Sequence, residues 1–505
     1  MNMTKAGSRE WIGLVVLSLA CVLYAMDLTV LHLAVPKISA SIHPTSSELL
    51  WIIDIYGFFV AGSLVTMGNL GDKIGRRKLL LIGAITFAIT STLAAFSTNP
   101  QMLIVSRALL GVSGATLAPS TLSLIRNMFH DDKQRSVAIG VWVSCFSLGA
   151  AIGPIIGGVL LEYFWWGSVF LLAIPVMAVL LVLGPILLPE FKDKSSRRLD
   201  PISAALSLGA ILSVIYGAKL VAQDGIGIMP VIFVILGIGI GTVFMVRQKR
   251  IPDPLVDIGL FRVRAFGGSL VTFLLGVFVA FGAFVFISQY LQLVLDLSPL
   301  QAGLWMLPWP VAFVVGSTIT PRLVHRISPR MIIAVGMIIS AMGLGLLVQI
   351  DTHTSFWLIM TALVVSSLGM APVFTLATDL VVGSAPPERA GAASAISETT
   401  AELGGALGIA VLGSIGTAMY RNELVSLLPA GLSQQTRQIS LDTLGGAVEA
   451  SKSLPPDIGN ALLEAAHQSF LSGLHLSMTV GVVLSISAAV LVLVLLKGVK
   501  ASQTH

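Results

Sequence analysis

Five ionisable side chains lie deep inside long apolar segments, where charged groups are rare unless they have a function. Four are carboxylates, Asp27, Asp54, Glu398 and Glu402, and one is a base, Arg107. Glu398 and Glu402 are four residues apart, so a helix places both on one face. Two carboxylates this close cannot both be comfortably ionised in a low dielectric, and we expect at least one to hold a proton. Such a pair is suited to carrying protons.

Arg107 needs a partner of opposite charge. It lies about 9 Å into its segment at the rise of a helix, and a charge near the centre of a bilayer costs about 2.5–3.5 kcal/mol on insertion scales. We therefore expect Arg107 to face the protein interior beside Asp27 or Asp54, which lie at similar depth. The pairing could be a stabilising ion pair alone, or a proton relay in which the arginine adjusts the proton affinity of a carboxylate.

The excess of deep carboxylates over bases favours positively charged ligands. Aromatic and sulfur-containing side chains near such a cavity could add cation–π and flat apolar contacts. Each taken alone is more commonly a lipid-facing or core residue, except Trp51 and Tyr56, which flank Asp54. The candidates for this substrate pocket are Trp51, Tyr56, Phe284, Tyr290, Trp305, Met306 and Trp309.

The composition shows what kind of element must hold these groups. Hydrophobic residues make up 55% and charged residues 11% of the chain, and the mean hydropathy is +0.92. Soluble domains carry about 25% charged residues, so the polar groups here are too few to cover a water-facing surface. The same numbers exclude disorder, collagen and nucleic-acid binding. The sequence predicts an all-α polytopic membrane protein.

Fourteen apolar segments are long enough to cross a bilayer, which takes about 20 residues each. Most of the 30 Lys and Arg residues fall in alternate loops. This asymmetry predicts an even number of spans with both termini in the cytoplasm. One soluble segment, at about 421–469 between the last two spans, has helical apolar spacing and predicts a short extracellular hairpin.

A weak internal repeat divides the chain. Residues 71–77, which follow the second span, are weakly similar to residues 324–330, which follow the tenth span. Residues 149–153 likewise resemble residues 404–408. A parallel repeat of this kind predicts an N-terminal six-helix bundle at 1–190 and a C-terminal six-helix bundle at 266–505. Residues 191–265 then form a linker with two additional transmembrane helices. Transporters with such repeats hold their substrate between the halves.

Several motifs resemble those of the major facilitator superfamily, and the resemblance covers essentially the whole chain. Residues 68–78 (GNLGDKIGRRK) resemble its cytoplasmic loop signature, and residues 107–114 (RALLGVSG) its fourth-helix motif. Residues 149–158 (GAAIGPIIGG) resemble the fifth-helix motif associated with proton-coupled exporters. The segments MDLTV, LWIIDIY and SETTAELG, which contain the four carboxylates, resemble the fourteen-helix drug:proton antiporters of the quaternary-ammonium and dye exporter type (Qac/Smv/Lfr-like).

This resemblance implies a fold, a function and a location. The fold is two six-helix bundles plus two inserted helices, and the function is proton-coupled efflux of lipophilic organic cations by alternating access. The implied substrates are quaternary ammonium compounds, dyes and biguanide-like antiseptics. The alternative is a related exporter or flippase for an antibiotic such as tetracycline or for an amphipathic lipid. We expect a monomer in the bacterial cytoplasmic membrane, in contact with membrane lipids and driven by the proton gradient without a cofactor.

The resemblance also restricts the expected range of substrates. Family members noted for handling divalent cations carry an acidic residue in the tenth span, where this chain has Phe313. Divalent substrates are therefore not expected.

A charged motif is the first candidate for conformational control. Gly71, Asp72 and Arg76 lie at a junction between two helices. A charge pair between Asp72 and Arg76, reinforced by the helix ends, could latch one access state and would have to break during transport.

A glycine stripe in the fifth span is the second candidate. Gly149, Gly153 and Gly157 share one helical face, with Pro154 beside them. Small residues at this spacing let helix backbones approach closely, and proline can bend a helix. We expect this face to act as a pivot or seal against the other half.

The sequence does not support an ATP-driven pump, an enzyme or a metal-binding protein. An ATP-driven pump needs a glycine-rich phosphate loop ending in Gly-Lys-Ser/Thr, and the sequence contains none. The eight histidines and the two cysteines form no pattern typical of an enzyme or a metal site. Asp379, near the cytoplasmic end of the twelfth span, is expected to be an interfacial carboxylate that reaches water.

Overall fold

The computed structural model describes residues 6–42, 44, 46–192, 200–224, 227–251, 254–324, 326–352, 354–386 and 390–499. All regular elements within these residues are helical. Thirteen helices or helix pairs are long and apolar enough to cross a membrane among the described residues. The 29-residue helix α2 is the fourteenth long segment, packed beside them. The predicted all-helical, fourteen-span architecture is confirmed.

The first eight helices pack together, α1 with α6 and α2 with α4 most extensively. Two breaks divide long spans: Ala115 and Thr116 lie between α4 and α5, and Leu172 lies between α7 and α8. These helices are α1 (Ser8–Ile42), α2 (Ser46–Ile74), α3 (Arg76–Ala95), α4 (Pro100–Gly114), α5 (Leu117–Met128), α6 (Asp132–Tyr163), α7 (Ser168–Leu171) and α8 (Ala173–Leu187).

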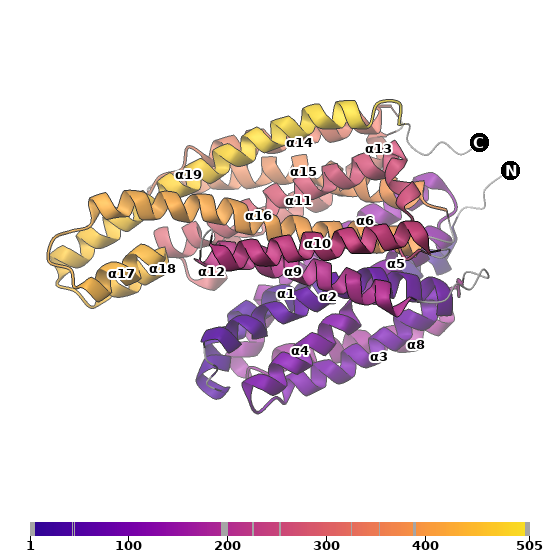
Figure 1. The fold of residues 1–505 in the computed structure, drawn as a ribbon, viewed down its shortest axis with the longest axis horizontal. Helices are drawn as coiled ribbons and strands as arrows, with labels where there is room; N and C mark the ends of the chain where they lie inside the picture. The colour runs from indigo at the N-terminus through magenta and orange to yellow at the C-terminus, as the bar shows by residue number, and fades with distance from the viewer. Residues whose placement is uncertain are drawn as a thin grey trace.

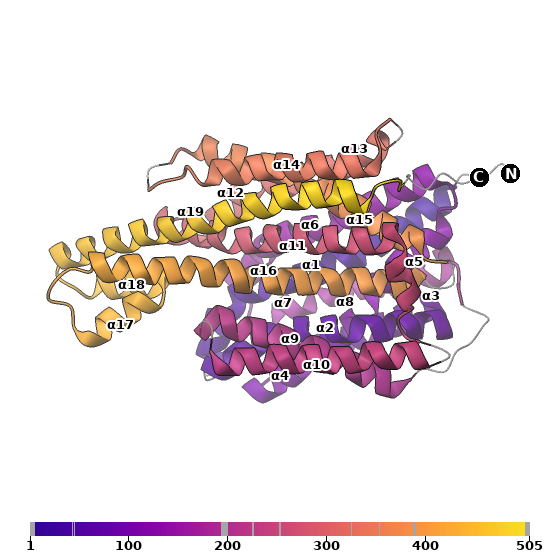
Figure 2. The same ribbon diagram turned by 45° about the horizontal axis from the view of Figure 1, so that its top comes forward.

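Two inserted helices follow, α9 (Pro201–Asp224) and α10 (Ile228–Arg250). An ion pair at 2.8 Å between Arg247 Nη2 and Asp200 Oδ2 ties the end of α10 to the start of α9. The pKa of Asp200 is held below its usual range: its slight burial acts to raise it, but hydrogen bonds from Ser203 and Arg247 outweigh that effect. Helix α9 packs against both α2 and α16, whereas α10 lies beyond α9 at the periphery (Figure 2).

The remaining helices form a second group, in which α11 packs on α16 and α14 on α15. Its elements are the 3-10 turn η1 (Ile258–Arg262), α11 (Arg264–Gln289), the π-helical turn η2 (Tyr290–Val294), α12 (Pro299–Met306), α13 (Pro308–Leu323), α14 (Pro329–Leu347), α15 (Phe356–Ser384), α16 (Ala390–Leu427), α17 (Gln434–Asp442), α18 (Leu444–Lys452) and α19 (Pro456–Leu495).

Helices α16 and α19 are much longer than a bilayer requires. They contain 38 and 40 residues, whereas about 20 residues cross the hydrocarbon core. Both extend beyond the other helices at one end of the molecule, where α17 and α18 pack against them (Figure 1). A hydrogen bond of 2.7 Å from Tyr420 Oη to Ser440 O holds α17 against α16 in this projecting part of the molecule. Both chain termini lie at the opposite end (Figure 1).

The glycine stripe of α6 faces α1. A Cβ built on Gly149 would lie 2.3 Å from the carbonyl oxygen of Val22, and one on Gly157 would lie 2.7 Å from Val30 Cγ1. Both neighbours belong to α1, within the same bundle, so the predicted pivot or seal against the other half is wrong for these two glycines. Gly153 is buried in the same helix, and the side chain of Pro154 lies outside the described residues.

A different face of α6 meets the C-terminal helices. A Cβ on Gly140 would lie 2.9 Å from Ser317 O of α13, and the hydroxyls of Ser144 and Ser317 are hydrogen-bonded to each other. The small residues that bring the two groups of helices together on α6 are therefore Gly140 and Ser144, which precede the conspicuous glycine motif.

Candidate functional site: charged and aromatic groups between the bundles

Arg107 of α4 pairs with Asp27 of α1, one of its two predicted partners. Arg107 Nη1 lies 3.4 Å from Asp27 Oδ2, and Nη2 donates to the carbonyl of Ile53 at 3.4 Å. Charge-assisted hydrogen bonds are usually 2.7–2.9 Å long, so this pair is loose. The arginine side chain is 1% exposed, and so this charge depends on the protein for its stabilisation. The side chain of Asp54 lies outside the described residues.

Aromatic rings complete the surroundings of Arg107. Its guanidinium carbon lies 5.1 Å from the ring centroid of Tyr56 and 5.9 Å from that of Phe170, which is within cation–π range. Tyr56 is fully buried, and two glycines of α4 make room for it. A Cβ on Gly111 would lie 2.5 Å from the carbonyl oxygen of Tyr56, and one on Gly114 would lie 3.0 Å from its hydroxyl. Gly111 and Gly114 of the RALLGVSG motif therefore allow α4 to pack closely against α2.

A hydrogen bond joins the acidic pair of α16 to α1. Tyr24 Oη donates to Glu402 Oε1 at 3.2 Å, and the rings of Tyr24 and Tyr56 lie 6.2 Å apart between centroids. Glu402, Tyr24, Tyr56, Arg107 and Asp27 therefore form one continuous series of neighbours. Because Glu402 belongs to the predicted C-terminal bundle and the others to the N-terminal one, this series crosses between them.

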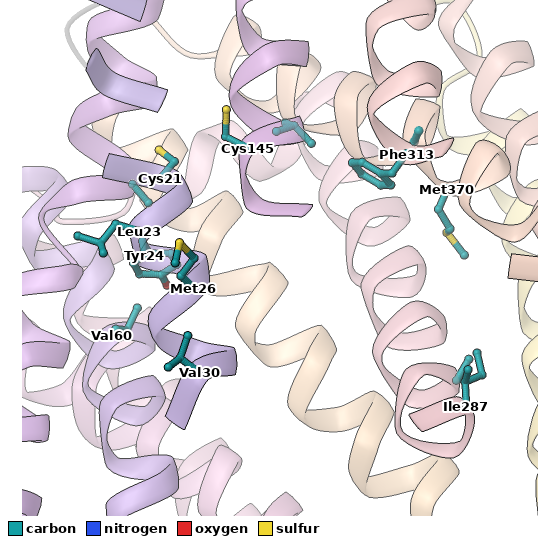
Figure 3. Close-up of a cluster of buried hydrophobic side chains, with 14 of the residues drawn as sticks. Cys21, Leu23, Tyr24, Met26, Val30, Val60, Cys145, Ile287, Phe313 and Met370 are labelled. Atoms are coloured by element: carbon teal, nitrogen blue, oxygen red, sulfur yellow. The ribbon is translucent and has the colours of Figure 1, made fainter. Parts of the chain in front are cut away.

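Tyr24 was not among the sequence-based candidates, although a signal for it exists. It lies three residues before Asp27 on the same helix, and residues at this spacing share a face. A tyrosine one turn from an intramembrane carboxylate is thus a candidate by the same argument that pairs Glu398 with Glu402. Figure 3 shows Tyr24 on α1 near Met26 and Cys21.

Glu398 lies one helical turn from Glu402 and differs from it in its contacts. Its side chain is half-buried, and no described residue donates a hydrogen bond to it or forms an ion pair with it. Glu402, in contrast, accepts a hydrogen bond from the Tyr24 hydroxyl. Within the described part of the chain, Glu398 thus keeps its full acceptor capacity for a cation or a proton, whereas one oxygen of Glu402 already accepts a hydrogen bond.

Three of the predicted pocket aromatics make contacts elsewhere. Trp51 stacks on Tyr216 of the inserted helix α9, with centroids 5.8 Å apart and planes at 14°. Tyr290 is buried, and its hydroxyl donates to Asp351 O at 2.7 Å. Trp305 packs edge-on against Phe356 at 4.5 Å. These contacts place Trp51 toward α9, and they engage Tyr290 and Trp305 within the C-terminal helices.

Three further candidates line a small pocket between helices α11 to α15, which we call the C-terminal pocket. Phe284, Met306 and Trp309 contribute to its wall together with Ser340, Ser366 and Met370. The pocket contains neither Glu398 nor Glu402. Figure 3 shows Met370 and Ile287, both lining residues, on the C-terminal helices, apart from the α1 side chains.

The charged motif lies at the junction of α2 and α3. Arg76 Nε donates to Asp72 Oδ1 at 2.8 Å, and the arginine is fully buried. A Cβ on Gly71 would lie 2.7 Å from Arg76 Nη1, so glycine there leaves room for the guanidinium. Gly75 has a φ of 114°, a left-handed conformation that favours glycine. The pair therefore fixes the turn between two helices of the same bundle.

A second polar cluster closes the seam between the bundles at the end where the termini lie. Asp379 Oδ2 accepts a hydrogen bond from Ser136 at 3.0 Å, and Asp379 Oδ1 lies 3.9 Å from Arg135 Nε. Arg126 donates to the carbonyls of Val382 and Ala385 at the end of α15, the latter at 2.6 Å. The expectation that Asp379 reaches water is wrong, because its side chain is 15% exposed and contacts α6.

Comparison with known proteins identifies the family. The Major Facilitator Superfamily profile matches residues 17–409. The chain belongs to the major facilitator superfamily. It is 41% identical over 489 residues to the multidrug efflux pump LfrA of Mycolicibacterium smegmatis, with 97% of each chain covered. It is 36% identical to the methyl viologen resistance protein SmvA of Salmonella typhimurium, covering 92% of this chain and 93% of that one.

A solved structure supports the fold over its full length. The human organic anion transporter MFSD10 superposes with a TM-score of 0.65 at 16% sequence identity, covering 96% of this chain and 99% of that chain. At this identity the likeness concerns the fold alone. Together with the family match and the two efflux relatives, it identifies a multi-pass membrane transporter of the drug-efflux type and not an enzyme.

Proposed function

We propose that this major facilitator protein exports lipophilic organic cations in exchange for protons by alternating access. The hydrogen bond between Tyr24 and Glu402 is the observation that carries the proposal. It joins an acidic pair, which can bind a cation or a proton, to α1 of the other bundle, the helix that also carries Asp27, the partner of Arg107. A change of protonation in one bundle thereby alters the electrostatic environment of the other bundle.

The exchange follows from competition for the same oxygens. An ionised Glu398, with no protein partner among the described residues, attracts a cation. When a proton neutralises the carboxylate, that attraction is lost and the cation is released. Proton entry and cation exit are then coupled because one acidic site cannot hold both.

The relatives support a cationic cargo. One is named a multidrug efflux pump and another a methyl viologen resistance protein. Methyl viologen carries two positive charges, which two adjacent carboxylates are suited to balance. Position 313, however, is a buried phenylalanine stacked on Trp309. We therefore propose monovalent quaternary ammonium compounds, dyes and biguanide-like antiseptics as the preferred class.

Alternating access needs two bodies that move relative to one another. We propose residues 1–190 and 266–505 as these bodies, with α9 and α10 as an inserted pair and both termini in the cytoplasm. The distribution of basic residues supports this orientation, as does the position of both termini at one end (Figure 1). The Asp379 cluster would then close the cytoplasmic side in the present conformation.

Ethidium efflux from cells tests the proposal directly. Cells that express the protein should expel ethidium, and a protonophore should stop efflux while ATP is held constant. The Glu398→Gln variant, expressed to the same level, should behave like the protonophore-treated wild type. Efflux that continues unchanged after collapse of the proton gradient would show that another energy source drives transport.

A further inference from the structure

The C-terminal pocket contains two serines whose hydroxyls have no partner. Ser340 of α14 is 1% exposed and Ser366 of α15 is 8% exposed. The Oγ atoms of both are buried without a hydrogen bond. Two other buried serines of the same bundle have partners: Ser367 Oγ donates to Trp309 O at 2.6 Å, and Ser317 Oγ is hydrogen-bonded to Ser144. A buried hydroxyl without a partner is unfavourable, and two such hydroxyls line one pocket.

The rest of the wall is apolar and aromatic. Phe284 and Trp309 offer ring faces, and Met306 and Met370 offer polarisable thioethers that adapt to flat ligands. None of the described residues that line the pocket is ionisable. A cation placed there would lose its hydration without gaining a counter-charge, so the pocket selects for uncharged groups.

The pocket and the acidic pair occupy different faces of α11. Helix α16 contacts α11 at Phe278 and Gly282, where Gly408 and Leu412 pack closely. The pocket uses the neighbouring face, with Val279, Ala283 and Ile287. A ligand in the pocket therefore need not touch Glu398 or Glu402.

The pocket holds about 30 Å³ in this conformation, the space of about two water molecules, so a two-ring ligand requires Phe284 to move outward. The Phe284 side chain is 44% exposed, whereas Val279, Ala283 and Ile287 of the same helix are buried. Rotation of an exposed ring requires no repacking of the core. Phe284 is thus placed to admit a flat molecule into the space below it.

We propose that the C-terminal pocket binds flat, uncharged aromatic molecules that carry one hydrogen-bonding group, with Ser340 and Ser366 as the partners of that group. This goes beyond the proposed transport of cations, because it gives the protein a second ligand class and a second site. Ring contacts with Phe284 and Trp309 supply affinity, and the two hydroxyls distinguish a ligand with a polar atom from one without.

Binding of 2-naphthol and naphthalene to the purified protein in nanodiscs tests this proposal, with empty nanodiscs subtracted. The double variant Ser340→Ala/Ser366→Ala should bind 2-naphthol about fivefold more weakly, the value of one buried hydrogen bond. Its affinity for naphthalene should be unchanged. Ala283→Phe should prevent binding of both compounds, because the new ring fills the pocket. Ser485→Ala is the matched control, since Ser485 is also buried and unpartnered but lies on α19 outside the pocket.

Thermal stability provides an independent readout. Removing an unpartnered buried hydroxyl relieves an unfavourable interaction, so the serine variants and the control should all unfold at temperatures equal to or above that of the wild type. Equal 2-naphthol affinity in the wild type and the double serine variant would overturn the proposal and would point to water or a lipid chain in the pocket. Ethidium binding, which depends on the acidic pair, should be unaffected by the serine variants. A failure of proton-driven ethidium efflux would therefore reject the transport proposal without touching this one.

Discussion

At the scale of single residues, the hydroxyl of Tyr24 is the contact that joins the two charged groups of this transporter. It donates to Glu402, and its ring approaches Tyr56, which in turn lies beneath Arg107. Three of the four carboxylates differ in their contacts: Asp27 pairs with a buried arginine, Glu402 accepts a hydrogen bond from a tyrosine, and Glu398 has no protein partner among the described residues.

The first prediction separates the two glutamates by the pH dependence of cation binding. Wild-type protein should bind ethidium more weakly as the pH falls, because protons compete for the carboxylates. Glu398→Gln should weaken binding at high pH by about tenfold and remove most of the pH dependence, since a charge-assisted contact is lost. Glu402→Gln should retain binding with a shifted pH profile, because it changes only the neighbour.

Fluorescence titration of purified protein from about pH 5.5 to 8.5 covers the range in which coupled carboxylates can titrate. A wild-type pH profile in both variants would remove this pair from the mechanism.

The second prediction concerns Tyr24. Tyr24→Phe keeps the ring but removes the donor to Glu402, so proton-driven ethidium efflux should fall about tenfold, the value of a hydrogen bond to a charged group. Ethidium affinity at fixed pH should change little, because Tyr24 is not proposed to touch the cargo. Tyr420→Phe is the matched control, since its hydroxyl bonds Ser440 far along the α16 projection. Unchanged efflux by Tyr24→Phe would mean that the hydrogen bond is structural only.

At the scale of elements, glycines decide which helix faces meet. Gly149 and Gly157 bring α6 onto α1, whereas Gly140 brings another face of α6 onto α13. One helix therefore carries two close contacts: one holds the N-terminal bundle together, and the other meets the C-terminal bundle. The two contacts should respond differently to an added methyl group.

The third prediction tests the α1–α6 contact. A Cβ on Gly149 would lie 2.3 Å from the Val22 carbonyl, so Gly149→Ala forces the backbones apart and should destabilise the protein by about 1–3 kcal/mol. Gly158→Ala is the control, because nothing lies within 4 Å of its added Cβ. It should leave the melting temperature unchanged or raise it, since alanine favours helix. Equal melting temperatures for the two variants would refute the close contact.

At the scale of the whole molecule, polar contacts join the two groups of helices at the end where both termini lie. There Arg126 binds carbonyls at the end of α15, and Asp379 contacts Ser136 and Arg135 of α6. The inserted helix α9 packs on both α2 and α16, so it borders the seam between the bundles. In the alternating-access cycle that we propose, a change of access state would break the first set of contacts.

The fourth prediction is that Asp379→Asn loosens this closure. Loss of the charge should weaken the contact with Arg135, and a cysteine placed at Ser384 should react with maleimide severalfold faster than in the parent. The two native cysteines are buried and should contribute little background. Glu190→Gln is the control, because its partner Arg77 belongs to the same bundle. An unchanged labelling rate would show that the cluster does not hold the closed state.

Much of this protein follows from its sequence, because a membrane requires long apolar helices and few charges. Fourteen spans and the family could be predicted from hydropathy and motifs. The pairing of Arg107 with Asp27 was one of two options, since a buried arginine needs a carboxylate at similar depth. The four-residue spacing of Glu398 and Glu402 determined that they share a face.

Only the tertiary structure decided which faces meet. Spacing within a helix fixes the relation between residues of that helix, but contacts between helices depend on how the helices rotate and pack. For this reason the Gly149 stripe meets α1, Trp51 stacks on α9, and Asp379 contacts α6. For the same reason Tyr24, on a helix nearly 380 positions earlier, becomes the hydrogen-bond donor to Glu402.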